Sequence, residues 1–164
     1  MNETDPIVII ISSAVILTIP IAIFYLANTY VARRWRKHQA ETVAKWEADG
    51  VEFTHGPVGG QFGGLESMGE KGVITGIGFM ALTTKDLRVT RANPSAEWHL
   101  SFRQIKGVAI QPAFLGKKSK KTPFIVVRFK QEGKADKLSF QVNDFENWAK
   151  VLAKKAGVSL KDLR

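Results

Sequence analysis

The chain has 164 residues and no cysteine, and its 24 Lys and Arg residues against 15 Asp and Glu residues give it a net charge of +9. The absence of cysteine excludes disulfide bonds, catalytic thiols and cysteine-ligated metal sites. The positive charge favours acidic partners, such as an anionic lipid surface.

A long uncharged segment lies near the start of the chain. No charged residue occurs from residue 6 to residue 32, and residues 7–27 are almost all Ile, Val, Leu, Ala and Phe. Roughly 20 helical residues cross a hydrocarbon core about 30 Å thick. We therefore predict a transmembrane helix over residues 6–30, after an extracytoplasmic tail of residues 1–5. A signal peptide or a buried core helix fits less well, because the start is acidic and the segment is long.

A basic cluster follows the uncharged segment and predicts its orientation. The cluster consists of Arg33, Arg34, Arg36 and Lys37. Such clusters stay on the cytoplasmic side, so we expect the N-terminus outside and the rest of the chain inside the cell (inner) membrane. A basic juxtamembrane helix is predicted over residues 31–49, ending at Gly50. Trp35 and Trp46 share one of its faces, which fits an interfacial helix, a stalk packed on the following domain, or a plain continuation of the membrane helix.

Residues 50–164 form one predicted domain of short strands. Apolar and polar residues alternate in seven segments, near residues 51–53, 73–83, 87–91, 98–103, 105–110, 124–130 and 138–142. We interpret the Gly-rich stretch between the first two segments, residues 56–69, as a connection between strands. An amphipathic helix is predicted over residues 144–156, with Asn143 as N-cap and Gly157 just past its end. Residues 158–164 are expected to form a helical turn or to fray.

These elements predict a mainly β fold. We expect a partly open barrel of about seven antiparallel strands, capped at one end by the C-terminal helix. A strongly bent sheet leaves part of its core uncovered, and a helix with a single apolar stripe can fill that opening.

Three segments within residues 72–156 point to a known family. Residues 78–90 read GFMALTTKDLRVT, residues 98–110 lead into Ile105 and Val108, and residues 140–148 read FQVNDFENW. They resemble the "G-x-L-x-L-T-x-x-R-L" hairpin, the next strand pair and the last strand with its capping helix in PH-like domains, in their bacterial and GRAM-like versions. Phosphoinositide-binding members carry basic residues in the loop after the first strand, whereas residues 56–69 contain none. The resemblance therefore implies a fold and not inositol phosphate recognition.

One lysine-rich loop is the candidate site. It contains Lys117, Lys118, Lys120 and Lys121. Two roles are open for this loop: it contacts anionic lipid or an acidic partner, or it is a solvated hairpin tip without a binding role. The three histidines show no metal-ligand spacing, and Gly116-Lys117 lacks the other residues of a phosphate-binding loop. No catalytic residue, metal site or cofactor is predicted.

The function predicted from the sequence is that of a non-enzymatic, membrane-anchored binding or scaffold protein. It presents a PH-like domain to a protein partner, with weak contact to anionic lipid. Attachment to a membrane argues against a nucleic acid partner for this basic domain. The alternatives are a sensor that binds a small ligand in a cleft near the Gly-rich segment, and a self-assembling structural platform.

Overall fold

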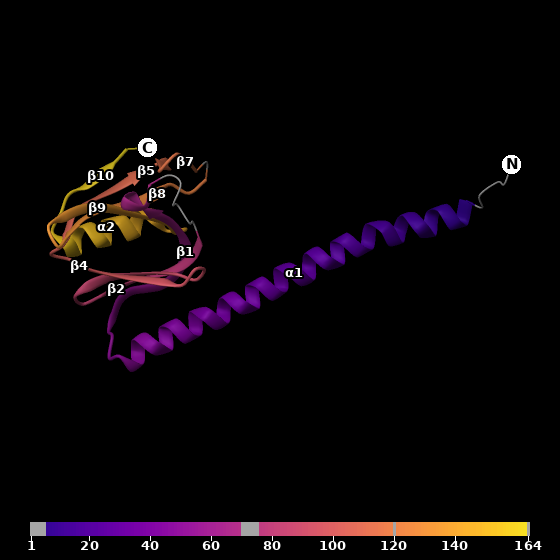
Figure 1. The fold of residues 1–164 in the computed structure, drawn as a ribbon, viewed down its shortest axis with the longest axis horizontal. Coiled ribbons are helices and arrows are strands. Elements are labelled where there is room, and N and C mark those ends of the chain that lie inside the picture. The colour runs from indigo at the N-terminus through magenta and orange to yellow at the C-terminus, as the bar shows by residue number, and fades with distance from the viewer. Residues whose placement is uncertain (1–5, 70–75, 120, 164) are drawn as a thin grey trace. The chain divides into compact units, whose positions relative to one another are not determined.

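The structure is a computed structural model that describes residues 6–69, 76–119 and 121–163, with side chains left out at residues 6–18 and 21. The chain divides into two compact units, residues 1–42 and residues 43–164. Each unit is described by itself (Figure 1).

A single long helix, α1 (Pro6–Ala48), covers the predicted membrane segment and the predicted juxtamembrane helix. It contains Pro20 and continues through it. Within the part of the chain that the structure describes, no helix has the length and apolar character needed to cross a membrane. The side chains of residues 6–18 lie outside the described part, so the transmembrane helix over residues 6–30 stays a prediction.

The second unit is mainly β. Its large sheet has the strand order β10-β5-β8-β9-β1-β2-β3-β4. These strands are β1 (Phe53–Leu65), β2 (Gly76–Thr83), β3 (Asp86–Arg91), β4 (Ala96–Ser101), β5 (Ile105–Gln111), β8 (Phe124–Gln131), β9 (Lys134–Gln141) and β10 (Leu160–Asp162). A short 3₁₀ helix, η1 (Glu66–Met68), follows β1. The sheet is open, with β4 and β10 at its edges, and it curves around helix α2 (Phe145–Ala156; Figure 1).

The core lies between the concave face of the sheet and α2. Alternate residues of β8 point inward, and Ile125, Val127 and Phe129 are all buried there. From α2, the predicted apolar stripe buries Trp148, Ala149 and Leu152 in the same cluster. The predicted mainly β fold with a C-terminal helix is thus confirmed. Instead of the predicted partly open barrel of about seven antiparallel strands, the described residues form an open sheet of eight strands, in which β10 runs parallel to β5.

The Gly-rich stretch is not a connection, and that prediction was wrong. Residues 56–64 lie within β1, which pairs with β2 along most of its length and with β9 at its end. A Cβ atom on Gly60 would lie 2.3 Å from the carbonyl oxygen of Gln141, and one on Gly63 would lie 2.2 Å from Ser139 Oγ. These glycines therefore let β9 approach β1 more closely than any side chain would permit.

Two details at the C-terminal end also differ from expectation. The residue that caps α2 is Asp144 and not Asn143, because the backbone N–H of Trp148 donates to the Asp144 carbonyl at 3.0 Å. Gly157 adopts the left-handed conformation expected past the helix end, with φ of 65°. Residues 160–162 form β10, parallel to β5, because the edge of β5 offers backbone groups that need partners.

Candidate functional site

The predicted lysine-rich loop is part of a small hairpin. Its strands are β6 (Ala113–Phe114) and β7 (Lys117–Lys118), paired antiparallel. Leu115 and Gly116 form the two-residue turn with φ of 47° and 74°. Two successive positive φ angles are typical of the tight turn that matches the twist of a hairpin. The sequence therefore places Lys117 directly after the turn.

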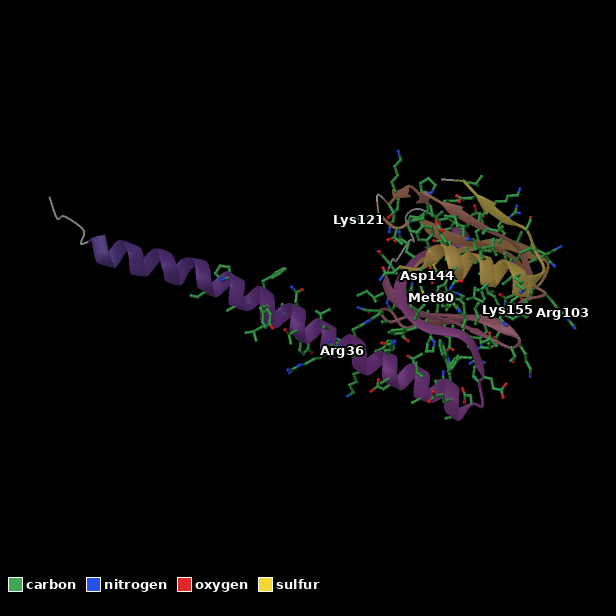
Figure 2. All side chains as sticks on the ribbon, turned by 180° about the vertical axis from the view of Figure 1, so that it is seen from behind. Arg36, Met80, Arg103, Lys121, Asp144 and Lys155 are labelled. Carbon is green, nitrogen blue, oxygen red and sulfur yellow. The ribbon has the colours of Figure 1, made fainter. Side chains whose placement is uncertain are left out.

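The hairpin contains two of the four predicted lysines, Lys117 and Lys118. Lys118 and Lys121 are exposed, whereas Lys117 is partly buried. Lys120 lies outside the described residues. Figure 2 shows Lys121 at the margin of the domain, away from Lys155 and Arg103 near the end of α2. Lys118 and Lys121 are thus exposed cations, and the contact of this loop with anionic lipid or an acidic partner stays a prediction.

The hairpin is held against the large sheet by an apolar cluster of its own. Phe114 of β6 packs with Phe124 and Val126 of β8, and all three are buried. The rings of Phe114 and Phe124 are 6.4 Å apart. The side-chain amide of Gln141 also donates to the Thr122 carbonyl just after the hairpin. These contacts hold the base of the hairpin against the large sheet. The lysines themselves gave no indication of this packing.

The basic cluster of α1 consists of exposed side chains. Arg33, Arg34 and Arg36 are exposed along the helix. Lys37 Nζ lies 3.9 Å from Glu41 Oε1, one turn later. An exposed pair of this kind contributes little to stability. Neither the exposure of these side chains nor the ion pair tests the predicted role of the cluster in membrane topology, which stays a prediction.

A second polar cluster, centred on Glu97 of β4, was not predicted from the sequence. The Trp46 indole Nε1 donates to Glu97 Oε1 at 2.5 Å, and Lys45 Nζ donates to Oε2 at 3.2 Å. His99 Nε2 lies 2.6 Å from Glu97 Oε1. Trp46 is fully buried, and the guanidinium of Arg88 lies 5.8 Å from its ring centre. The cluster therefore ties residues 45 and 46 to the outer side of β3 and β4.

The environment of Glu97 changes its acidity. Burial alone would raise the pKa of this carboxyl, but hydrogen bonds from His99, Trp46 and Lys45 outweigh the burial and lower its pKa. Glu97 is therefore held as a carboxylate. Three donors share this one carboxylate. We call the cluster of Glu97, Trp46, Lys45 and His99 the Glu97 clasp, and we assign it a structural role because it joins two distant segments of the chain.

A buried arginine closes the β3–β4 turn. Arg91 is only 5 % exposed, and its Nε donates to the Pro94 carbonyl at 2.8 Å. Its guanidinium lies 5.7 Å from the ring centre of Phe62 and 5.6 Å from that of Trp98. The two rings are stacked 4.5 Å apart. The guanidinium thus has a hydrogen-bond acceptor and two aromatic contacts within the domain, so we assign Arg91 a structural role.

Two of the three histidines contact different neighbours within the domain. His55 packs edge-on against Trp148 with ring centres 4.6 Å apart, whereas His99 contacts Glu97. Among the residues that the structure describes, no three His, Asp or Glu side chains converge to hold a metal ion. The surface lysines and the Glu97 clasp are therefore the polar features from which a function can be argued.

Comparisons with known proteins extend the fold assignment but not the function. No protein-family model matches the chain, and no curated protein matches it. Among solved structures, the chain is similar to the hSac2 domain from the human phosphoinositide phosphatase Sac2, with a TM-score of 0.52 and 12% identity. The match covers 78% of this chain and 88% of that one. At this identity the likeness establishes the fold alone.

Proposed function

We propose that the chain is a membrane-anchored, non-enzymatic binding protein. Its first helix crosses the cell (inner) membrane over residues 6–30, and its PH-like domain faces the cytoplasm and binds a protein partner. Contact with anionic lipid orients the domain. The observation that carries the proposal is the uncharged segment of residues 6–32, followed at once by four basic residues.

Three features support the proposal. The uncharged segment and the basic cluster belong to one continuous helix, as a membrane anchor with its cytoplasmic extension requires. Residues 51–164 carry nineteen Lys and Arg against ten Asp and Glu, so the domain has a net charge of +9. The neighbour with the shared fold comes from a phosphoinositide phosphatase, which fits a fold used near lipid, although a shared fold does not transfer an activity.

The structure gives the sensor alternative little support. It relied on a ligand cleft near the Gly-rich stretch, but two of the glycines there, Gly60 and Gly63, are explained by the close packing of β1 against β9. Residues 56–64 lie within β1, which is paired with β2 and, from Gln61 onward, also with β9, so the stretch is a strand and not a ligand loop. The binding-protein proposal needs no such cleft.

Membrane extraction tests the anchor directly. Ile16→Lys places a charge near the middle of the predicted span and costs about 3 kcal/mol of insertion free energy. We expect the full chain to stay in membranes after alkaline carbonate washing, and the Ile16→Lys variant to be released or degraded. Ile16→Leu is the matched control and should behave like the original chain. Release of the original chain by carbonate would refute the anchor.

A further inference from the structure

The outer surface of one half of the sheet is basic. We define the basic face as the outward-pointing side of β5, β8, β9 and β10. In β8, the inward residues Ile125, Val127 and Phe129 belong to the core, so Val126, Arg128 and Lys130 point outward. Arg128 and Lys130 are exposed. Strand pairing extends this alternation to the neighbouring strands.

Cations from three strands contribute to the basic face. Arg128 of β8 lies opposite Lys137 of β9, and Gly107 of β5 lies on the other side of Arg128. A Cβ atom on Gly107 would lie 2.6 Å from an Nη atom of Arg128, so the guanidinium extends over this glycine. Lys161 of β10 lies beside Ala109, which is paired with the outward residue Val126. The basic face therefore contains Arg128, Lys130, Lys137 and Lys161.

Acidic residues are scarce on this face. Within the described residues, the outward positions of these four strands include no Asp or Glu, because Asp136 and Asp162 are paired with the inward residues Phe129 and Ile110. Glu66 reaches the face from η1 and pairs with Lys137, with Oε1 and Nζ 2.6 Å apart. The remaining three cations have no acidic residue beside them in the strand register.

The hairpin joins this face and does not form a separate site. Val126 is an outward residue, and the buried cluster that holds the hairpin consists of Val126, Phe124 and Phe114. The hairpin therefore packs on the same side of the sheet as Arg128 and Lys130. Its exposed Lys118 and the nearby Lys121 extend the basic surface beyond the ends of the strands.

We infer that the basic face, together with the hairpin lysines, is the surface through which the domain lies on an anionic phospholipid bilayer. This inference rests on the proposed membrane anchor, because a tether lets individually weak contacts orient a domain. Charges spread over a sheet and a hairpin suit a fluid lipid surface, whose anionic head groups rearrange beneath them. A folded acidic partner would have to match the fixed positions of the same charges.

Energy transfer to labelled lipid head groups tests the inference on the full chain in phospholipid nanodiscs. The chain lacks cysteine, so Ala135→Cys and Thr84→Cys each provide a single labelling position. Residue 135 lies on the basic face opposite Lys130, whereas Thr84 lies in the exposed β2–β3 turn. We expect several-fold stronger transfer from position 135 than from position 84 in bilayers containing phosphatidylserine. The difference should disappear at high salt or in pure phosphatidylcholine.

Charge variants supply the second part of the test. Arg128→Gln/Lys130→Gln/Lys161→Gln should abolish the phosphatidylserine-dependent transfer at position 135. Lys85→Gln/Lys150→Gln/Lys154→Gln removes three exposed charges away from the face and should preserve it. Equal transfer at both positions, equal losses in both triple variants, or insensitivity to phosphatidylserine would overturn the inference. The inference would also be overturned if the Arg128→Gln/Lys130→Gln/Lys161→Gln variant lost binding to an acidic protein but kept its phosphatidylserine-dependent energy transfer.

Failure of the anchor gives a different result. A chain that does not insert is absent from the nanodiscs of both compositions, which contradicts the proposed function. The same full chain is then floated with phosphatidylserine vesicles. Binding that is lost in the Arg128→Gln/Lys130→Gln/Lys161→Gln variant alone would support the basic face, and no binding would overturn it.

Discussion

Glu97 links two segments that are far apart in sequence. Its carboxylate accepts hydrogen bonds from Trp46 and Lys45, which are 51 and 52 positions earlier, and contacts His99 on its own strand. The indole of Trp46 is fully buried and needs an acceptor for its N–H group. Loss of the charge at Glu97 therefore weakens contacts on both segments.

Glu97→Gln should lower stability in a pH-dependent manner. The hydrogen bonds lower the pKa of Glu97 below the ordinary value of 4.5, so its charge stabilises the folded state above that pH. This contribution is lost as the pH falls through the lowered pKa, because the carboxyl is then protonated in both folded and unfolded chains. We expect the original chain to be more stable than Glu97→Gln near neutral pH and the difference to close below pH 4.5.

Denaturant titrations of the detergent-solubilised full chain measure this difference. Glu132→Gln, in the exposed β8–β9 turn, controls for the loss of one negative charge. A difference that stays constant from neutral to acidic pH would argue against the assigned role of the Glu97 charge.

Trp148→Ala should remove a central part of the core. Trp148 is 3 % exposed and packs against His55 and Phe140, with ring centres 4.6 and 6.3 Å away. We expect a loss of about 3–5 kcal/mol in the free energy of unfolding. Denaturation followed by circular dichroism measures it, with Trp35→Ala in α1 as the control that leaves the domain core intact. A loss below about 1 kcal/mol would show that α2 is not an essential cover of the core.

Among the elements, β2 carries the clearest backbone constraint. A Cβ atom on Gly78 would lie 1.8 Å from the Thr90 carbonyl oxygen, whereas one on Gly76 would lie 3.1 Å from a side-chain carbon of Arg91. Gly78→Ala should therefore shift the backbone and cost on the order of 1–3 kcal/mol, and Gly76→Ala should cost much less. Thermal denaturation of the two variants makes the comparison, and equal midpoints would contradict it.

Elements with local signals were predictable from the sequence. The spacing of Trp148, Ala149 and Leu152 indicated the buried side of α2, and Gly157 marked its end. The break between the predicted strand segments 73–83 and 87–91 also corresponds to a turn. In the structure, Thr83 Oγ1 accepts hydrogen bonds from the backbone N–H groups of Lys85 and Asp86.

Elements that depend on distant partners were not predictable. Glycines usually indicate turns, and only the approach of β9 explains why Gly60 and Gly63 lie in a strand. Strand β10 has three residues, too few for a visible alternation, and exists because β5 presents an unpaired edge. The Glu97 clasp and the basic face likewise bring together residues from separate strands, which no local pattern reveals.

For the whole molecule, charge and hydropathy divide the chain into complementary parts. An uncharged segment is followed by a domain of net charge +9, and the outward side of four of its strands is cationic. In our proposal, the helix holds this domain near the membrane and the basic face determines how it lies there. A protein partner would then bind the surfaces left free.

The topology of the full chain tests this account most directly. Asn2→Cys and Ser119→Cys provide single thiols on the two sides of the predicted span, since the natural chain has none. The measurement is labelling of spheroplasts with a membrane-impermeant maleimide, before and after lysis. We predict that position 2 is labelled in intact spheroplasts and position 119 only after lysis. Labelling of position 119 in intact spheroplasts, or recovery of the chain outside the membrane fraction, would contradict the account.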